Sequence, residues 1–150
     1  MSQSLSKIYL HIIFGTKNWQ PIIKEPHNKK LHSYLVGVCK NVNCSPIAVN
    51  GHLNHVHILC RFAKNITVSD FLEALKTQSS TWMKQQDDSL KNFYWQKGYA
   101  AFSIAENSVD NTRHYIDTQE EHHSRVSYRE EIIELIQEHG LEYDERYFWD

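Results

Sequence analysis

The sequence of 150 residues has no long apolar run, and it contains little cysteine, glycine or proline. A membrane-spanning helix needs about 20 consecutive apolar residues, so we expect none, and the opening segment MSQSLSK lacks the apolar core of a signal peptide. Three cysteines without a close CxxC pair exclude a disulfide scaffold and favour a reducing, cytoplasmic location. The five glycines and three prolines form no linker, so we expect a single domain over residues 1–150.

The composition is otherwise that of a globular protein, with 41% hydrophobic and 23% charged residues. The unusual counts are ten histidines and 12% aromatic residues, which include four tryptophans. The net charge of −2 hides an asymmetry, because residues 1–119 carry +5 and residues 120–150 carry −7. The chain is therefore expected to have a basic body, which permits binding to a polyanion, and an acidic C-terminal helix and tail.

Hydrophobic periodicity predicts an alternation of strands and short helices. We expect strands over residues 7–14, 47–49, 52–62 and about 100–104, and helices beginning at Pro26, at Ser69 and at Asn107 or Ser108, with a last helix over about 130–139 ended by Gly140. Asn50-Gly51 is typical of a tight turn between two strands. The order β-α-β-β-α-β-α predicts an α+β fold, ferredoxin-like or RRM-like, in which an antiparallel sheet has its helices on one face.

The strand predicted over residues 52–62 carries the sharpest chemical feature, His55-Val56-His57. Residues two apart on a strand point to the same face, so both imidazoles can bind one divalent metal while Val56 anchors the strand in the core. A pair of surface histidines is the alternative reading of the same pattern. By the same alternation Cys60 faces the core and Arg61 shares the face of the histidines.

Tyr115 and Gln119 lie four residues apart in a predicted helix and therefore project from the same face. A tyrosine beside a metal-bound phosphate is a competent nucleophile, because the cation screens the phosphate charge and favours the phenolate. The alternative for an isolated tyrosine is simple packing. His114, His122 and His123 flank this helix and are expected to be mainly solvent-exposed.

Five blocks of the chain together resemble the single-tyrosine HUH transposases of small insertion sequences, including the REP-associated tyrosine transposases. The blocks are HIIFGTK (11–17), NHVHIL (54–59), LKTQSS (75–80), WQKGYA (95–100) and YIDTQEEHH (115–123). The resemblance covers nearly the whole chain, and the blocks jointly are far more specific than any one of them.

The resemblance implies a metal-dependent enzyme that nicks and rejoins single-stranded DNA at hairpin-bearing element ends. It implies that His55, His57 and Gln119 hold Mg²⁺ or Mn²⁺ and that Tyr115 attacks a phosphate, giving a 5′-phosphotyrosine and a free 3′-OH. It also implies that the protein is a homodimer and that the HUH motif lies on a central strand of the sheet.

Other readings of the same residues stay open. An RRM-like module could bind nucleic acid without cleavage, whereas a histidine-triad-like phosphohydrolase would need a third histidine where the chain has Leu59. Candidate phosphate contacts are Lys17, Arg61 and Lys76. The C-terminal aromatic segment over residues 143–149 is expected to dock on the sheet or on a dimer partner.

Overall fold

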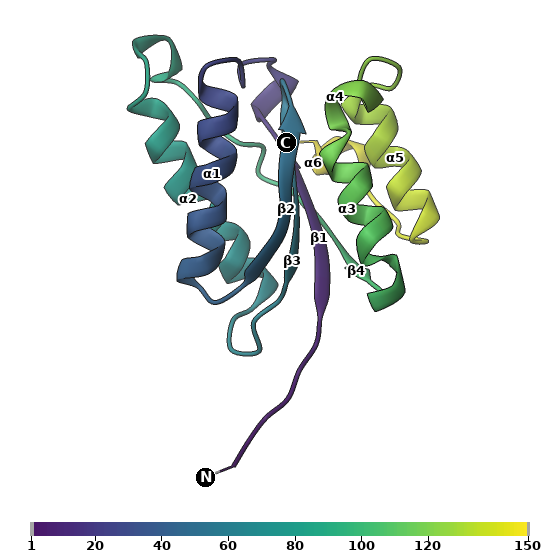
Figure 1. Ribbon diagram of the computed structural model, residues 1–150. Helices are drawn as coiled ribbons and strands as arrows, with labels where there is room; N and C mark the ends of the chain where they lie inside the picture. The colour runs from purple at the N-terminus through teal and green to yellow at the C-terminus, as the bar shows by residue number, and fades with distance from the viewer. Residues whose placement is uncertain (1, 150) are drawn as a thin grey trace.

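A four-stranded antiparallel sheet lies between two layers of helices in the computed structural model, which describes residues 2–149 without the side chain of Tyr147 (Figure 1). The strands are β1 (Tyr9–Gly15), β2 (Ser45–His52), β3 (His55–Arg61) and β4 (Ala100–Ile104). The helices are α1 (His27–Asn41), α2 (Val68–Lys84), α3 (Val109–Asp117), α4 (Gln119–His122), α5 (Tyr128–Glu138) and α6 (Glu145–Phe148), with short 3-10 turns at Lys17–Trp19, Asp88–Leu90 and Glu106–Ser108. Met1 and Asp150 lie outside the described residues.

The strand order β2-β3-β1-β4 confirms the predicted α+β architecture. β1 pairs with β3 on one side and with β4 on the other, and every pairing is antiparallel. β3, which carries the two histidines of the HUH motif, therefore lies inside the sheet between β1 and β2. Within the described chain, no helix is both long and apolar enough to cross a membrane.

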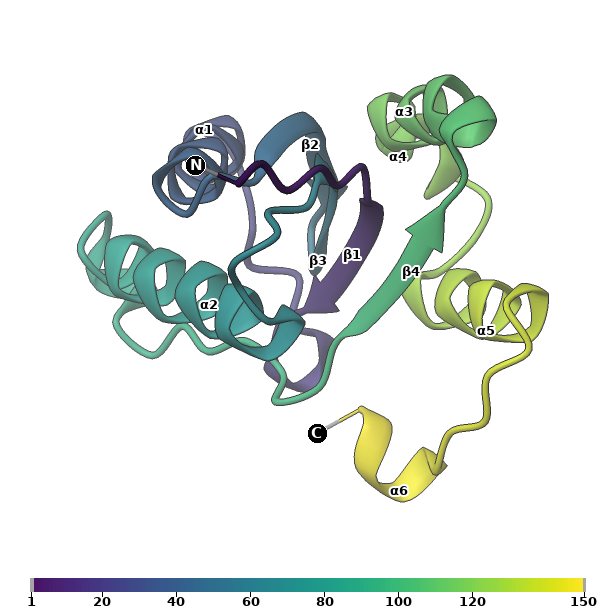
Figure 2. The ribbon, with the colours of Figure 1, turned by 90° about the horizontal axis from the view of Figure 1, so that it is seen from below.

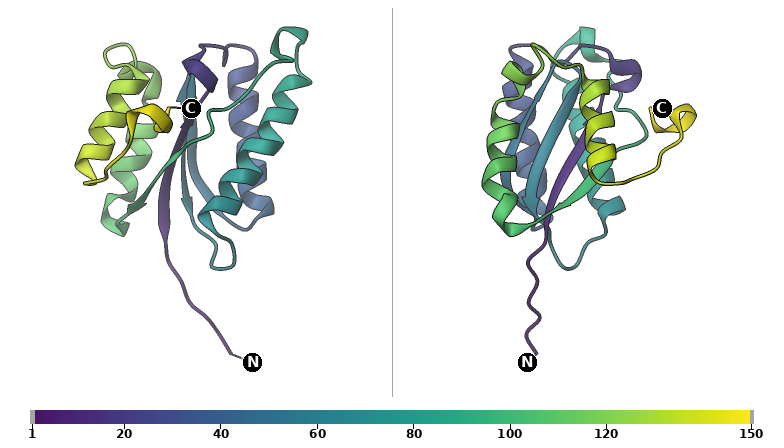
Figure 3. Two further views of the ribbon diagram at one scale, coloured as in Figure 1. Left: turned by 180° about the vertical axis from the view of Figure 1, so that it is seen from behind. Right: turned by 90° about the vertical axis from the view of Figure 1, so that its right-hand side faces the viewer.

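Helices cover both faces of the sheet, which corrects the expectation of helices on one face only. Figures 2 and 3 show α1 and α2 on one side of the sheet and α3, α4 and α5 on the other. The physical reason is that the second face also carries apolar side chains, which would otherwise meet water. Leu59 packs with Ile116 of α3, and Ile13 packs with Ile132 of α5.

The face covered by α1 and α2 holds the larger hydrophobic core. Side chains from β1 and β3 alternate into it as predicted, among them Phe14, Val56 and Ile58, all fully buried. Burial raises the pKa of the Cys60 thiol, which is also fully buried here, so this cysteine is an unreactive core residue as expected.

The end of β2 differs from the sequence prediction. Asn50 and Gly51 are not in a turn, because β2 continues to His52 and the chain reverses at Leu53 and Asn54. A tight approach of two strands, rather than a turn, explains the glycine: a Cβ at Gly51 would lie 2.2 Å from the carbonyl oxygen of His55.

The helix starts and stops also differ in detail. Thr67, not Ser69, caps α2, because its side chain accepts a hydrogen bond from the Asp70 amide. The helix expected to run from residue 108 through residue 119 breaks at Thr118, which has non-helical angles between α3 and α4. Gly140 follows α5 with a φ of +66°, as expected for a helix stop.

We expect Gly51→Ala to lower the free energy of unfolding by about 1–3 kcal/mol, the range for overpacking a tight site. The added Cβ can be accommodated only if β2 moves away from His55, which would weaken the strand pairing beside the site. Equilibrium unfolding in urea measures the effect. The control is Gly37→Ala in α1, where a Cβ would meet nothing within 4 Å; equal stabilities of the two variants would contradict the prediction.

Candidate metal centre and nucleophile

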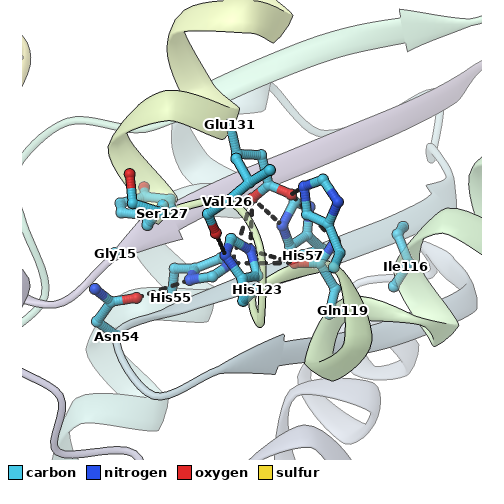
Figure 4. Close-up of polar contacts among 12 residues, drawn as sticks. Gly15, Asn54, His55, His57, Ile116, Gln119, His123, Val126, Ser127 and Glu131 are labelled. Atoms are coloured by element: carbon cyan, nitrogen blue, oxygen red, sulfur yellow. Dashed lines mark hydrogen bonds and ion pairs between the residues drawn. The ribbon is translucent and has the colours of Figure 1, made fainter.

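Strand β3 presents His55 and His57 toward the layer formed by α3, α4 and α5 (Figure 4). Both side chains are fully buried, while Val56 between them points into the opposite core. Because successive side chains of a strand point to opposite faces, Val56 packs in the core while His55 and His57 face the site. The predicted shared face of the two histidines is confirmed by their ring centroids, which lie 5.1 Å apart.

The helices add three further polar side chains to this pair. Gln119 comes from the start of α4, His123 follows α4, and Glu131 lies in the first turn of α5. The Glu131 Oε1 atom lies 3.0 Å from His57 Nε2, 3.2 Å from His123 Nε2 and 3.4 Å from His55 Nε2. One ligand atom from each of these four residues falls within 4.8 Å of all the others, so the group can hold a divalent metal.

The outer nitrogens of two histidines determine what the inner nitrogens offer. Nδ1 of His123 lies 2.6 Å from the backbone carbonyl of Val126, and Nδ1 of His55 lies 2.9 Å from Asn54 Oδ1. A carbonyl oxygen only accepts, so each Nδ1 donates its proton, which leaves Nε2 as the nitrogen that can bind a metal. This is the arrangement in which metal-bound histidines are usually held.

The Gln119 amide oxygen points to the same small buried volume as these nitrogens. The Gln119 Oε1 atom lies 3.1 Å from His55 Nε2 and 2.9 Å from His123 Nε2. The amide is oriented this way because its nitrogen donates to Glu131 Oε2 at 3.2 Å. Imidazole nitrogens, a carboxylate and an amide oxygen are all possible metal ligands, so the donor set fits a divalent metal.

The charges of the site support the same conclusion. Burial opposes the ionisation of Glu131, yet hydrogen bonds from His123, His55 and His57 hold the pKa of this carboxyl well below its usual range. Burial also lowers the pKa of His55, to about 4. Glu131 is 1% exposed and has no lysine or arginine partner among the residues that the structure describes.

Tyr115 of α3 reaches the same centre. Its hydroxyl donates a hydrogen bond to Glu131 Oε2, and its ring centroid lies 5.7 Å from that of His57. Burial and the Glu131 charge raise the pKa of the phenol, so the side chain is protonated. A cavity of about 420 Å³ opens beside Tyr115 between β4, α3 and α5, which gives a substrate a way to the hydroxyl.

The structure brings together the four residues singled out for the centre, Tyr115, His55, His57 and Gln119. The break at Thr118 does not separate the tyrosine from the glutamine, whose Nε2 atom lies 3.4 Å from the Tyr115 carbonyl oxygen. The three candidate DNA contacts lie elsewhere. Lys17 is exposed near Tyr94, and Arg61 donates to the Ser6 carbonyl at 3.0 Å.

Sequence reasoning missed three members of the cluster. His123 was expected to be exposed, yet its side chain is only 3% exposed and lies inside the centre. The Nε2 atom of His11, in β1, lies 2.8 Å from His57 Nδ1, so His11 orients the His57 ring. Burial lowers the pKa of His11. Glu131 lies in an acidic run without any spacing signal; only the pairing of β1 with β3 could have indicated His11.

Comparisons with known proteins identify a family and structures with a similar fold. The family model described as "Transposase IS200 like" matches residues 4–119. A protein of Deinococcus radiodurans R1 assigned as a transposase aligns with a TM-score of 0.62 and 20% identity, covering 79% of this chain and 98% of that one. A REP-associated tyrosine transposase bound to a REP hairpin aligns with a TM-score of 0.53 and 16% identity, covering 79% and 70% of the two chains. Curated proteins give no significant match.

Lys76 has a structural environment that bears on its predicted contact with DNA. Its Nζ atom donates to the carbonyl oxygens of Gln96, Lys97 and Gly98 at 2.8, 3.0 and 2.7 Å, and burial lowers its pKa to about 8. These bonds tie α2 to the WQKGYA block.

We therefore expect Lys76→Ala to lower the free energy of unfolding by about 1.5–3 kcal/mol, the usual contribution of a hydrogen bond to a charged group. Urea unfolding measures it, with the exposed neighbour Lys97→Ala as the control. Unchanged stability in Lys76→Ala would instead leave this ammonium free for a phosphate.

Proposed function

Because the chain belongs to the family of IS200-like transposases, we propose that it nicks and rejoins single-stranded DNA through Tyr115 at a divalent metal centre. The observation that carries this proposal is the position of the Tyr115 hydroxyl. It bonds to the Glu131 carboxylate, which also contacts His55, His57 and His123. An attacking oxygen and a cation site in one place are what a phosphoryl transfer to tyrosine requires.

The residues proposed to hold the ion are His55, His57 and Gln119, with Mg²⁺ or Mn²⁺ as the metal. When bound, such an ion neutralises charge on the phosphate and stabilises the oxygen that develops charge. The chain itself supplies position: β3 holds the histidines rigidly, and α3 holds the tyrosine against them.

The proposed reaction conserves a phosphate ester throughout. The Tyr115 oxygen gives up its proton and bonds to a DNA phosphorus, the bond from phosphorus to the 3′ oxygen breaks, and the departing 3′ oxygen takes up a proton. The products are a 5′-phosphotyrosine and a free 3′-OH. Attack by a 3′-OH of another strand then reverses the chemistry, releases the tyrosine and rejoins the DNA without an external energy source.

The substrate is proposed to be single-stranded DNA with hairpins at the ends of an element. The structural neighbour bound to a REP hairpin supports this choice. We further propose a homodimer in the cytoplasm. A binding module without cleavage is the main alternative, since a ferredoxin-like sheet also suits nucleic-acid recognition.

We expect Tyr115→Phe to abolish a covalent protein–DNA adduct while leaving DNA binding within about twofold. The variant removes only the attacking oxygen, so the rings around it keep their packing. The assay incubates the protein with Mn²⁺ and labelled single strands from the DNA flanking its own gene, and a denaturing gel shows whether label migrates with protein.

Tyr34→Phe is the matched control, because Tyr34 lies in α1 on the opposite face of the sheet, stacked on Trp82. It should form the adduct as the unmodified protein does. Cleavage by Tyr115→Phe would show that the nucleophile is a different group. A strand that binds but forms no adduct, across varied hairpins, would favour the binding module.

A further inference from the structure

The acidic C-terminal segment contributes to the centre although it lies beyond the matched family region. The family match ends at residue 119, whereas His123 and Glu131 follow it in a segment that carries a net charge of −7. Most acidic residues of α5 face outward, yet Glu131 points into the cluster and is almost completely buried. Figure 4 shows its carboxylate among the histidine rings.

The distances around Glu131 Oε1 are those of neighbouring ligands on one ion. With metal–ligand bonds of about 2.1 Å, adjacent ligand atoms are separated by about 3.0–3.4 Å in octahedral or tetrahedral coordination. Glu131 Oε1 lies 3.0, 3.2 and 3.4 Å from the Nε2 atoms of His57, His123 and His55. The side chains are therefore close to ligating positions and need little rearrangement.

We propose that His123 and Glu131 complete the metal centre and make it selective for Mn²⁺ and related transition ions over Mg²⁺. This inference rests on the metal site of the proposed function. The ligand set becomes three imidazole nitrogens, the Glu131 carboxylate and the Gln119 amide oxygen.

The donor chemistry gives the preference. Mg²⁺ requires oxygen ligands, dehydrates reluctantly and usually keeps several waters. A buried centre in which three of the five donors are imidazole nitrogens offers it few oxygen atoms, whereas imidazole suits first-row transition ions. Among these the expected order of affinity is Mn²⁺ below Fe²⁺ below Co²⁺, as for other nitrogen and oxygen sites.

The two carboxylate oxygens of Glu131 connect metal binding to the stability of the folded chain. Its Oε1 atom faces the histidines of β3, and its Oε2 atom accepts the Tyr115 hydroxyl of α3. An ion bound through Oε1 thus connects β3 and α5 directly and leaves the second oxygen to hold the nucleophile. Metal binding should therefore stabilise the folded chain as well as occupy the site.

The test uses the full-length chain stripped with a chelator, and Mn²⁺ alone as the probe. We expect Glu131→Gln to weaken Mn²⁺ binding at least tenfold, measured by calorimetry or by the loss of the free-Mn²⁺ electron paramagnetic resonance signal. A hundredfold excess of Mg²⁺ should displace less than half of the Mn²⁺ from the unmodified protein. Saturating Mn²⁺ should raise the Tm of the unmodified protein and raise that of the variant by much less.

The matched control is Glu130→Gln, which removes the same charge one residue earlier on an exposed face of α5. It should bind Mn²⁺ as the unmodified protein does, and circular dichroism checks that both variants fold. If Glu131→Gln does not fold, His123→Gln gives the same test from the other added ligand. Equal Mn²⁺ affinity in the folded variant and the unmodified protein, or ready displacement by Mg²⁺, would overturn the proposal.

No DNA enters this measurement, so its failure differs from failure of the proposed function. Loss of Mn²⁺ selectivity with an intact Tyr115 adduct would overturn the ligand set and leave the nicking reaction in place. A selective metal centre without a Tyr115 adduct would overturn the nicking reaction and leave the ligand set in place.

Discussion

The buried carboxylate of Glu131 is the constraint around which the second helical layer is organised. A buried anion is strongly unfavourable unless charges or hydrogen bonds compensate for it. Here the compensation comes from His57, His123 and His55 on one oxygen and from Tyr115 and Gln119 on the other. These partners come from β3, α3 and the region of α4, so one side chain of α5 fixes the relative positions of all of them.

The sheet makes this arrangement possible because the side chains of β3 alternate between its two faces. Val56 and Ile58 pack into the apolar core against α1 and α2, which holds the strand in place. His55 and His57 then face the other way at fixed spacing, with backbone bonds to β1 and β2 on both sides. Ligands on such a strand lose little further freedom when an ion binds, because the fold has already ordered them.

Sequence reasoning reached the parts of the site that depend on local periodicity. The two-residue period of a strand was enough to place His55 and His57 on one face, and the resemblance added Tyr115 and Gln119. The helix expected to join those last two is broken at Thr118, yet Gln119 still reaches the centre because the chain turns back at once into α4. The α+β fold class also followed from the order of elements.

What sequence reasoning could not reach depends on packing between distant segments. Glu130 and Glu131 are neighbours of identical type, and only the contact of α5 with the sheet through Ile132 decides which of them is buried. The same contact explains why helices cover both faces, since α5 buries apolar residues of β1 and β4 on that face. His11 was likewise predicted only to lie in a strand. The register places Ile13 opposite His57, which brings His11 beside His57.

The electrostatics of Tyr115 connect the nucleophile to the metal centre. Burial and the Glu131 charge both raise the pKa of the phenol, which keeps the oxygen protonated. A divalent ion at Glu131 would lower this pKa, because it would neutralise the carboxylate that opposes ionisation of the phenol. Nucleophile activation and metal binding are therefore two consequences of the same buried carboxylate.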